Sequence, residues 1–155
     1  MAGRIEREIH QTKAVRSPHE EALLNIVRTA DLLSMAVGTL LKPHGLSGTQ
    51  YNVLRILRGA GNDGVSCKDI GARLITRDPD ITRLMDRLEQ RGLIVRGRAT
   101  EDRRIVTHRL TGSGMELVNQ LDGPVDDLNR RLLGHVPPEK LNQLVNLLEQ
   151  VREAL

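Results

Sequence analysis

The apolar residues of the chain recur mostly at intervals of three and four, which is the spacing of one face of an α-helix. Residues 20–41 form the first such series, and their apolar band is wide, so we expect this helix to be buried on more than one side. A second helix is predicted to begin at Ser47, which forms a capping box with Gln50. A short third helix is predicted to begin at Ser66 and to bear Ile70.

A fourth helix and a β-hairpin follow. Asp78 is predicted as the helix N-cap with Pro79 in the first helical position, and Gly92 as the residue that ends the helix. The ranges 93–98 and 104–110 are rich in strand-forming residues and are joined by residues 99–103. The apolar residues of the helix lie at i, i+3, i+4 and i+7: Ile81, Leu84, Met85 and Leu88.

Two helical segments complete the chain. Thr111 is predicted to cap the first, and Pro124 to kink it. The second carries a ladder of apolar residues at alternating intervals of three and four: Leu141, Leu144, Leu148, Val151 and Leu155. Such a ladder needs a partner surface, and we expect that surface to be a second copy of the chain, with packing inside one subunit as the alternative.

The order helix, short helix, turn, helix and hairpin is that of a winged helix-turn-helix. We therefore predict a mainly α fold with a small β-hairpin wing and with dimerisation helices at both ends. Residues 1–45 are interpreted as a tail and a dimerisation helix, the tail being a short helix or frayed. Residues 46–111 are interpreted as the DNA-binding lobe, and residues 112–155 as C-terminal dimerisation helices.

Composition narrows the class of protein. The chain of 155 residues is long enough for a core of its own, and its one cysteine rules out an internal disulfide framework. It has one tyrosine and no phenylalanine or tryptophan, which disfavours modules that stack bases on aromatic side chains. The N-terminus has no apolar signal segment, and no apolar run approaching the ~20 residues of a membrane span is expected. These features predict a cytoplasmic protein without a membrane partner.

Positive charge is concentrated in one stretch. From Lys68 to Arg109, 11 Lys and Arg residues stand against 7 Asp and Glu, a net charge of +4, whereas the rest of the chain carries a net charge of −1. A local basic footprint is what phosphate binding requires.

The second helix of a helix-turn-helix lies in the major groove of DNA. At 100° per residue, the face opposite its apolar residues presents Thr82, Arg83, Asp86 and Gln90, and Arg87 flanks this face. Arginine reads guanine with two hydrogen bonds, and threonine accepts either base. Asp80 belongs to the same DNA-facing end, where a carboxylate costs electrostatic affinity unless it accepts from cytosine N4.

Other cations extend the predicted contact surface. Lys68 and Arg77 lie near helix N-termini, where phosphates dock. At the hairpin tip, Arg103 and Arg104 suit a narrow minor groove, while Asp102 is expected to pair with a neighbouring arginine and to fix the tip. The predicted DNA-binding set comprises Lys68, Arg77, Asp80, Thr82, Arg83, Arg87, Arg98, Asp102, Arg103 and Arg104. The alternative is a solvated face on which Arg83, Arg87 and Arg91 pair with Asp86 and Glu89.

Four segments in this order resemble the multiple-antibiotic-resistance regulator (MarR) family of bacterial transcription factors: residues 46–54, residues 81–94, residues 102–104, and Leu110-Thr111 with Gly114. The resemblance covers roughly residues 20–155. It implies a homodimer that binds a pseudo-palindromic operator in double-stranded DNA and acts as a repressor. Many members of the family release DNA when a small anion, a metal or an oxidant acts on them.

The resemblance also places an effector cleft between the dimer helices and the DNA-binding lobe, for a small anionic or aromatic molecule. Candidate lining residues are Tyr51, Arg28 and His44, chosen for reach and polarity. Cys67 lies near a helix N-terminus, where a lowered pKa would make it a redox sensor; the alternative is a small, half-buried residue.

No catalytic motif, phosphate loop or cofactor fingerprint is found, so we expect no enzyme, no cofactor and no catalytic residue. The five histidines show no ligand-like spacing and predict no metal site within one chain, with a zinc site assembled across a dimer as the alternative. The competing function is a winged helix used for protein contact or dimerisation without DNA binding.

Overall fold

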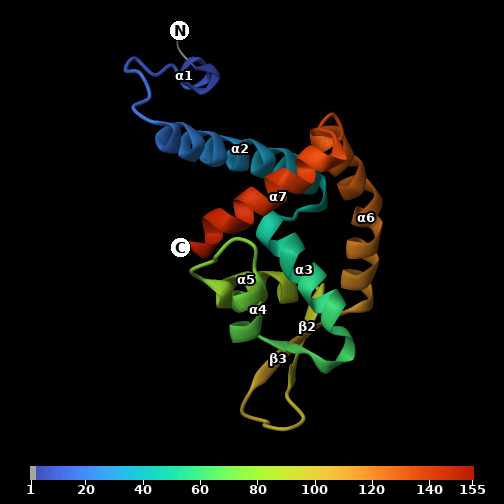
Figure 1. Ribbon diagram of the computed structural model, residues 1–155. Helices are drawn as coiled ribbons and strands as arrows, with labels where there is room; N and C mark the ends of the chain where they lie inside the picture. The colour runs from blue at the N-terminus through green and yellow to red at the C-terminus, as the bar shows by residue number, and fades with distance from the viewer. Residues whose placement is uncertain (1–2) are drawn as a thin grey trace.

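The computed structural model describes residues 3–155, and helices dominate it (Figure 1). The small sheet and its long loop lie at the opposite end of the molecule from α1 and α2. In chain order the elements are α1 (Arg4–Glu8), α2 (Pro18–Leu41), the 3₁₀ turn η1 (Lys42–His44), α3 (Gly48–Ala60), the 3₁₀ turn η2 (Gly61–Asp63), β1 (Val65–Ser66), α4 (Cys67–Arg73), α5 (Ile81–Gln90), β2 (Ile94–Arg98), β3 (Val106–Leu110), α6 (Gly112–Leu133) and α7 (Pro138–Glu153).

Helix starts follow local capping chemistry. The side chains of Ser47, Ser66 and Thr111 each accept the N–H of the third helical residue, as predicted, and Ser47 completes its capping box with Gln50. The predicted start of α5 is wrong by two residues. Its N-cap is Asp80, because the carboxylate of Asp78 accepts the N–H of Asp80 at 2.8 Å and holds Pro79 in a turn before the helix.

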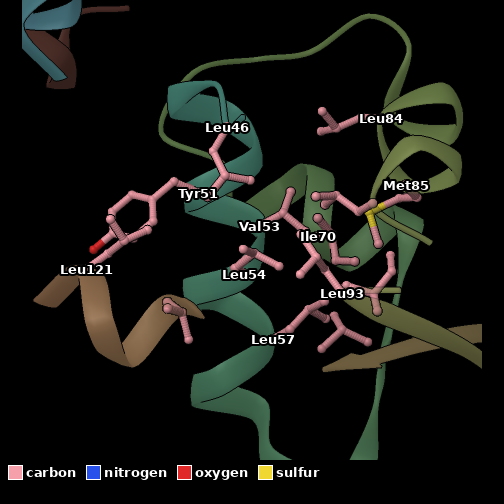
Figure 2. Packing of buried hydrophobic residues seen from close by; sticks show 14 of the residues in the cluster. Leu46, Tyr51, Val53, Leu54, Leu57, Ile70, Leu84, Met85, Leu93 and Leu121 are labelled. Carbon is pink, nitrogen blue, oxygen red and sulfur yellow. The ribbon is translucent and has the colours of Figure 1, made fainter. Parts of the chain in front are cut away.

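The core is aliphatic and forms around α3. Val53, Leu54 and Leu57 on α3 are almost fully buried, as are Met85 and Leu88 on α5. Figure 2 shows the labelled side chains of α3 and α5 converging with Ile70 of α4 and with Leu93, just before β2, while Leu121 of α6 lies at one side. The core therefore fixes one face of α5 and leaves the opposite face free.

The sheet has three strands rather than the predicted two, in the order β1-β3-β2, and both pairings are antiparallel. β2 and β3 form the predicted hairpin, with Ile94 opposite Leu110 and Arg98 opposite Val106. β1 pairs Val65 with His108. A two-residue strand has no periodicity of its own, so only its pairing with β3 defines it.

A two-point ion pair attaches α3 to α6. Arg58 donates to both carboxylate oxygens of Asp122, at 2.7 and 2.9 Å, and also to the amide oxygen of Asn119 at 2.9 Å. The bidentate geometry fixes orientation as well as distance. It joins the lobe built on α3 to the long helix that leaves it.

The apolar side chains of α2 and α7 are largely exposed in the single chain. The prediction that α2 is buried on more than one side fails here: Leu23 and Val27 are each 60% exposed, and among the helix residues only Leu41 is buried. On α7, Leu144, Val145, Leu147 and Val151 are exposed as well. Within residues 3–155, the apolar faces of α2 and α7 therefore stay largely uncovered.

The segment from Pro18 to His44 is long and apolar enough to cross a bilayer by length and composition alone, which corrects the prediction that no run approaches that length. Its mean hydropathy over the most apolar 18-residue window is 1.3. A core helix of a water-soluble protein meets the same criteria, so one such helix is weak evidence for a membrane role.

Candidate nucleic-acid interface

Helix α5 is amphipathic, and its core packing decides which side chains face outward. Leu84, Met85 and Leu88 are buried against the lobe, whereas Thr82, Arg83 and Arg87 are exposed. The three predicted readers therefore lie together on one outer face of a helix that is held rigidly from behind. Such a face can enter a major groove without disturbing the core.

The acidic residue at the N-terminal end of α5, Asp80, makes a hydrogen bond within the chain. Asp80 caps the helix, with its carboxylate Oδ1 accepting the backbone N–H of Arg83 at 3.2 Å. Arg77 is exposed in the connection that precedes this cap, and Lys68 is exposed in the second position of α4. The structure thus gives Asp80 a capping role, and it places Arg77 and Lys68 at the surface beside the starts of α5 and α4.

The loop between β2 and β3 projects away from the helical body (Figure 1). Arg103 and Arg104 are exposed in this loop, and Arg98 is exposed at the end of β2. The expected pairing of the Asp102 carboxylate with an arginine side chain is wrong. Its Oδ1 instead accepts the backbone N–H of Arg104 at 2.9 Å, because this short contact closes the turn locally. Asp102 therefore shapes the tip and leaves both guanidinium groups available to a ligand.

Sequence reasoning missed Arg96, which pairs with both acidic residues of α5. From β2, its Nε lies 2.7 Å from Glu89 Oε2, and its Nη2 contacts Asp86 Oδ1. The alternative in which Asp86 and Glu89 neutralise Arg83 and Arg87 is therefore not what the structure shows. A spacing of three residues puts both acids on one side of α5, and the arginines of the next strand were the available signal.

The end of α5 makes a second contact that the sequence did not predict. The guanidinium of Arg91 donates to the backbone oxygens of His44 and Gly45, at the end of η1. Arg91 therefore turns toward the α2–α3 connection and is not part of the outer stripe with Arg83 and Arg87.

Cys67, the first residue of α4, contacts His108 of β3. Cys67 is half-buried, and its Sγ lies 4.0 Å from Nδ1 of His108, which is almost fully buried. Burial raises the pKa of the Cys67 thiol, opposed by the nearby charge of Arg96. The structure therefore supports the alternative of a small, half-buried residue and not a thiol whose pKa is lowered at a helix N-terminus. Burial likewise lowers the pKa of His108 and favours its neutral form.

The three candidate effector residues occupy different environments. Tyr51 is buried, with the guanidinium carbon of Arg55 5.9 Å from its ring centroid, and burial raises its pKa. Arg28 has a buried Nε with no hydrogen-bond partner, and its Nη1 is 3.9 Å from Asp31. The surface cavities of about 680 and 470 Å³ lie at the N-terminal segment and beside the β2–β3 loop, and neither is lined by Tyr51, Arg28 or His44.

Metal chemistry has no candidate cluster in the described part of the chain. Within residues 3–155, no three His, Cys, Asp or Glu side chains come together in a way that could hold a metal ion.

Comparison with known proteins gives one consistent result. The sequence model of the MarR family matches residues 44–105, from the end of η1 to the loop after β2. The chain is 25% identical to the homoprotocatechuate degradative operon repressor of Escherichia coli, over 85% of this chain and 88% of the repressor. Among solved structures, a MarR transcription factor from Planctomyces limnophilus is 39% identical, with a TM-score of 0.67 over 88% of this chain and 98% of that one. CouR from Rhodococcus jostii RHA1, solved bound to p-coumaroyl-CoA, is 28% identical, with a TM-score of 0.75 over 88% and 95% of the two chains.

Proposed function

The chain belongs to the MarR family of DNA-binding transcriptional regulators, and on this premise we propose that it is a homodimeric repressor released from its operator by a small effector. Its relative in Escherichia coli bears the name of an operon repressor. Since its proposed ligand is double-stranded DNA, we place its action in the cytoplasm and assign it no membrane partner.

The observation that carries the DNA-binding proposal is the outer face of α5. Thr82, Arg83 and Arg87 are exposed there, and the acids that could neutralise the two arginines are engaged by Arg96. Exposed donors on a helix whose other face is packed suit base edges in the major groove. We assign Thr82, Arg83 and Arg87 to base reading.

The remaining predicted contacts supply affinity. Arg103 and Arg104 at the loop tip are assigned to phosphate or to the minor groove, and Lys68, Arg77 and Arg98 to phosphates. Asp80 and Asp102 act beside the DNA by capping α5 and by closing the tip, as their backbone contacts support.

The dimer proposal rests on the uncovered apolar faces of α2 and α7. Met35 is 62% exposed and Val151 is 48% exposed in one chain. A second copy covering both helices would bury more than ~2,000 Å² in total, the range of obligate dimers. Two symmetric copies of α5 then read half-sites about 10 bp apart, centre to centre.

The effector proposal is a small anionic or aromatic molecule held between the dimer helices and the lobe. Among the similar structures, CouR was solved bound to p-coumaroyl-CoA. In this chain, the unpartnered Nε of Arg28 supports an anion, and Tyr51 and His44 are the other proposed contacts. A thermal-shift screen of aromatic acids would find a ligand, and Tyr51→Ala and Arg28→Ala should then weaken the shift. An unchanged response in both variants removes this site.

The decisive experiment for DNA binding begins with in vitro selection of duplexes from a random library by the purified wild-type protein. Fluorescence anisotropy then compares the selected duplex with a random duplex at 50 and 200 mM salt. We expect tighter binding to the selected duplex and a steep loss of affinity with salt. Failure to enrich any sequence, with no salt-dependent binding, would favour the second function, a protein-contact module.

A further inference from the structure

Arg91 connects the end of α5 to the end of the α2–η1 segment. Its Nη1 donates to the carbonyl oxygen of Gly45 at 2.6 Å, and its Nη2 donates to the carbonyl oxygen of His44 at 2.9 Å. Arg91 is the C-cap residue of α5, and His44 is the last residue of η1. Two terminal nitrogens of one rigid group thus hold two consecutive carbonyls 46 and 47 residues away in the chain.

The contact is favourable for a general reason. The last carbonyl groups of a helix lack intrahelical partners, and a cation near a helix C-terminus stabilises them. A planar guanidinium that donates twice fixes orientation as well as distance, which a lysine ammonium does not. Gly45 adopts a left-handed conformation with a φ of 64°, and an ideal Cβ built there would lie 3.4 Å from Nη2 of Arg91. The guanidinium therefore rests directly against the Gly45 backbone.

No other hydrogen bond joins α5 or its C-cap to η1 within residues 3–155. α5 also packs against α4 and β2, and its buried residues join the core around α3. Arg91 is therefore the polar link between the helix that meets DNA and the helix that carries an exposed apolar face.

We propose that Arg91 is a positioning residue that sets the separation of the two DNA-reading helices in the dimer. The inference rests on the proposed function, in which α2 lies at the dimer seam and α5 lies in the major groove. In each subunit Arg91 then adds to the packing of α2 on α3 and α6, and so helps to fix α5 relative to the dimer axis. Without this link, α5 keeps its fold and its readers, but its lobe moves more freely against the seam.

The alternative role for an exposed arginine at this end of α5 is a phosphate contact. The two roles differ in what they control. A phosphate contact adds affinity to every duplex and contributes about 1 to the slope of log K against log salt. A positioning residue controls how strongly the dimer prefers one spacing of half-sites, because one inserted base pair rotates the second half-site by about 34°.

The experiment uses the full-length protein and the palindromic duplex recovered by in vitro selection. Derivatives of this duplex have one or two base pairs added or removed at the centre. Wild type, Arg91→Met, Arg91→Gln and Arg91→Lys are compared by anisotropy on each duplex and over a salt series, with thermal melting to confirm that each variant is folded. Arg131→Met, which removes an exposed arginine from α6, is the matched control.

We expect a change of one base pair to lower the affinity of wild type and Arg131→Met for the duplex by about tenfold or more. The reason is that the second half-site is displaced from its α5 and loses its base contacts. For Arg91→Met and Arg91→Gln the penalty should fall below about threefold with an unchanged salt slope, and Arg91→Lys should restore it only in part.

A spacing penalty in Arg91→Met and Arg91→Gln equal to that of wild type would overturn the positioning role. So would an equal loss on all duplexes accompanied by a shallower salt slope, which identifies a phosphate contact. If wild type itself enriches no duplex, the proposed function fails first, and this result is distinct from both.

Discussion

Glu89 on α5 and Arg96 on β2 form an ion pair, with Arg96 Nε 2.7 Å from Glu89 Oε2. The same guanidinium contacts Asp86, so one residue of the sheet holds two acids of the helix. This arrangement orients α5 against the wing and keeps both carboxylates away from Arg83 and Arg87. The outer face of α5 therefore keeps the positive charge of Arg83 and Arg87, which favours an anionic ligand.

Arg96→Ala should weaken operator binding more than it weakens the fold. The side chains involved are 35–44% exposed, so the loss of stability should stay below about 1 kcal/mol, or about 2–4 °C in Tm. Binding should fall further, because Asp86 and Glu89 become free to repel phosphates. Thermal melting and anisotropy measure the two effects. In an Asp86→Asn/Glu89→Gln background the same substitution should have little effect, and a full effect there would contradict the pairing.

Arg83→Ala should lower specificity. A lost two-point contact to a base costs about 1–3 kcal/mol on the operator and little on random DNA. Anisotropy on the selected and random duplexes measures the difference. An equal loss on both duplexes would mean that Arg83 contacts phosphate, and no loss on either would remove α5 from the interface.

Arg104→Ala should lower affinity on all duplexes alike. Contacts to phosphate carry no sequence information, and the slope of log K against log salt should become shallower by about 1. Salt titrations on the same two duplexes test this, with Arg131→Ala as a charge-matched control distant from the loop. A loss confined to the selected duplex would instead make Arg104 a base reader.

Val151→Arg should disrupt the dimer, since it places a charge on the exposed apolar face of α7. Light scattering at micromolar concentration should give about twice the chain mass of 17.3 kDa for wild type and a lower average mass for the variant. Asn146→Arg changes the opposite face of the same helix and should leave the mass unchanged. A folded wild-type species near 17.3 kDa would contradict the dimer.

His108 should make stability depend on pH near neutrality. Its pKa in the folded chain lies below the ordinary value of 6.5, chiefly because of burial, so the unfolded chain binds more protons between the two values. The free energy of unfolding should therefore be full above about pH 6.5 and should decrease as the pH falls through the folded-state pKa. Urea denaturation between pH 5 and 7.5 measures the slope.

His108→Gln should flatten this dependence, whereas His135→Gln, in an exposed turn, should keep it. Hydrogen bonds from Arg58 lower the pKa of Asp122 below 3.8. Asp122 therefore titrates below the pH range of this measurement and does not contribute to the slope. A slope that persists in His108→Gln would assign the dependence to other groups.

The sequence alone determined the features that depend on neighbours within one or two turns. Helical periodicity located α2 to α7, side-chain caps fixed the starts at Ser47, Ser66 and Thr111, and Gly92 ended α5 in its left-handed conformation. The outer face of α5 also followed from the sequence, because 100° per residue separates its polar and apolar sides. These are local interactions, and a linear pattern records them.

Tertiary structure decided what depends on residues far apart in the chain. β1 exists because Val65 meets His108, and Arg96 and Arg91 have partners only because the sheet and η1 approach α5. The pKa of Cys67 followed its burial beside His108 and Arg96 rather than its place at a helix N-terminus. A spacing pattern carries no record of such approaches, since an ion pair or a desolvation cost is set by distance in space and not by separation along the chain.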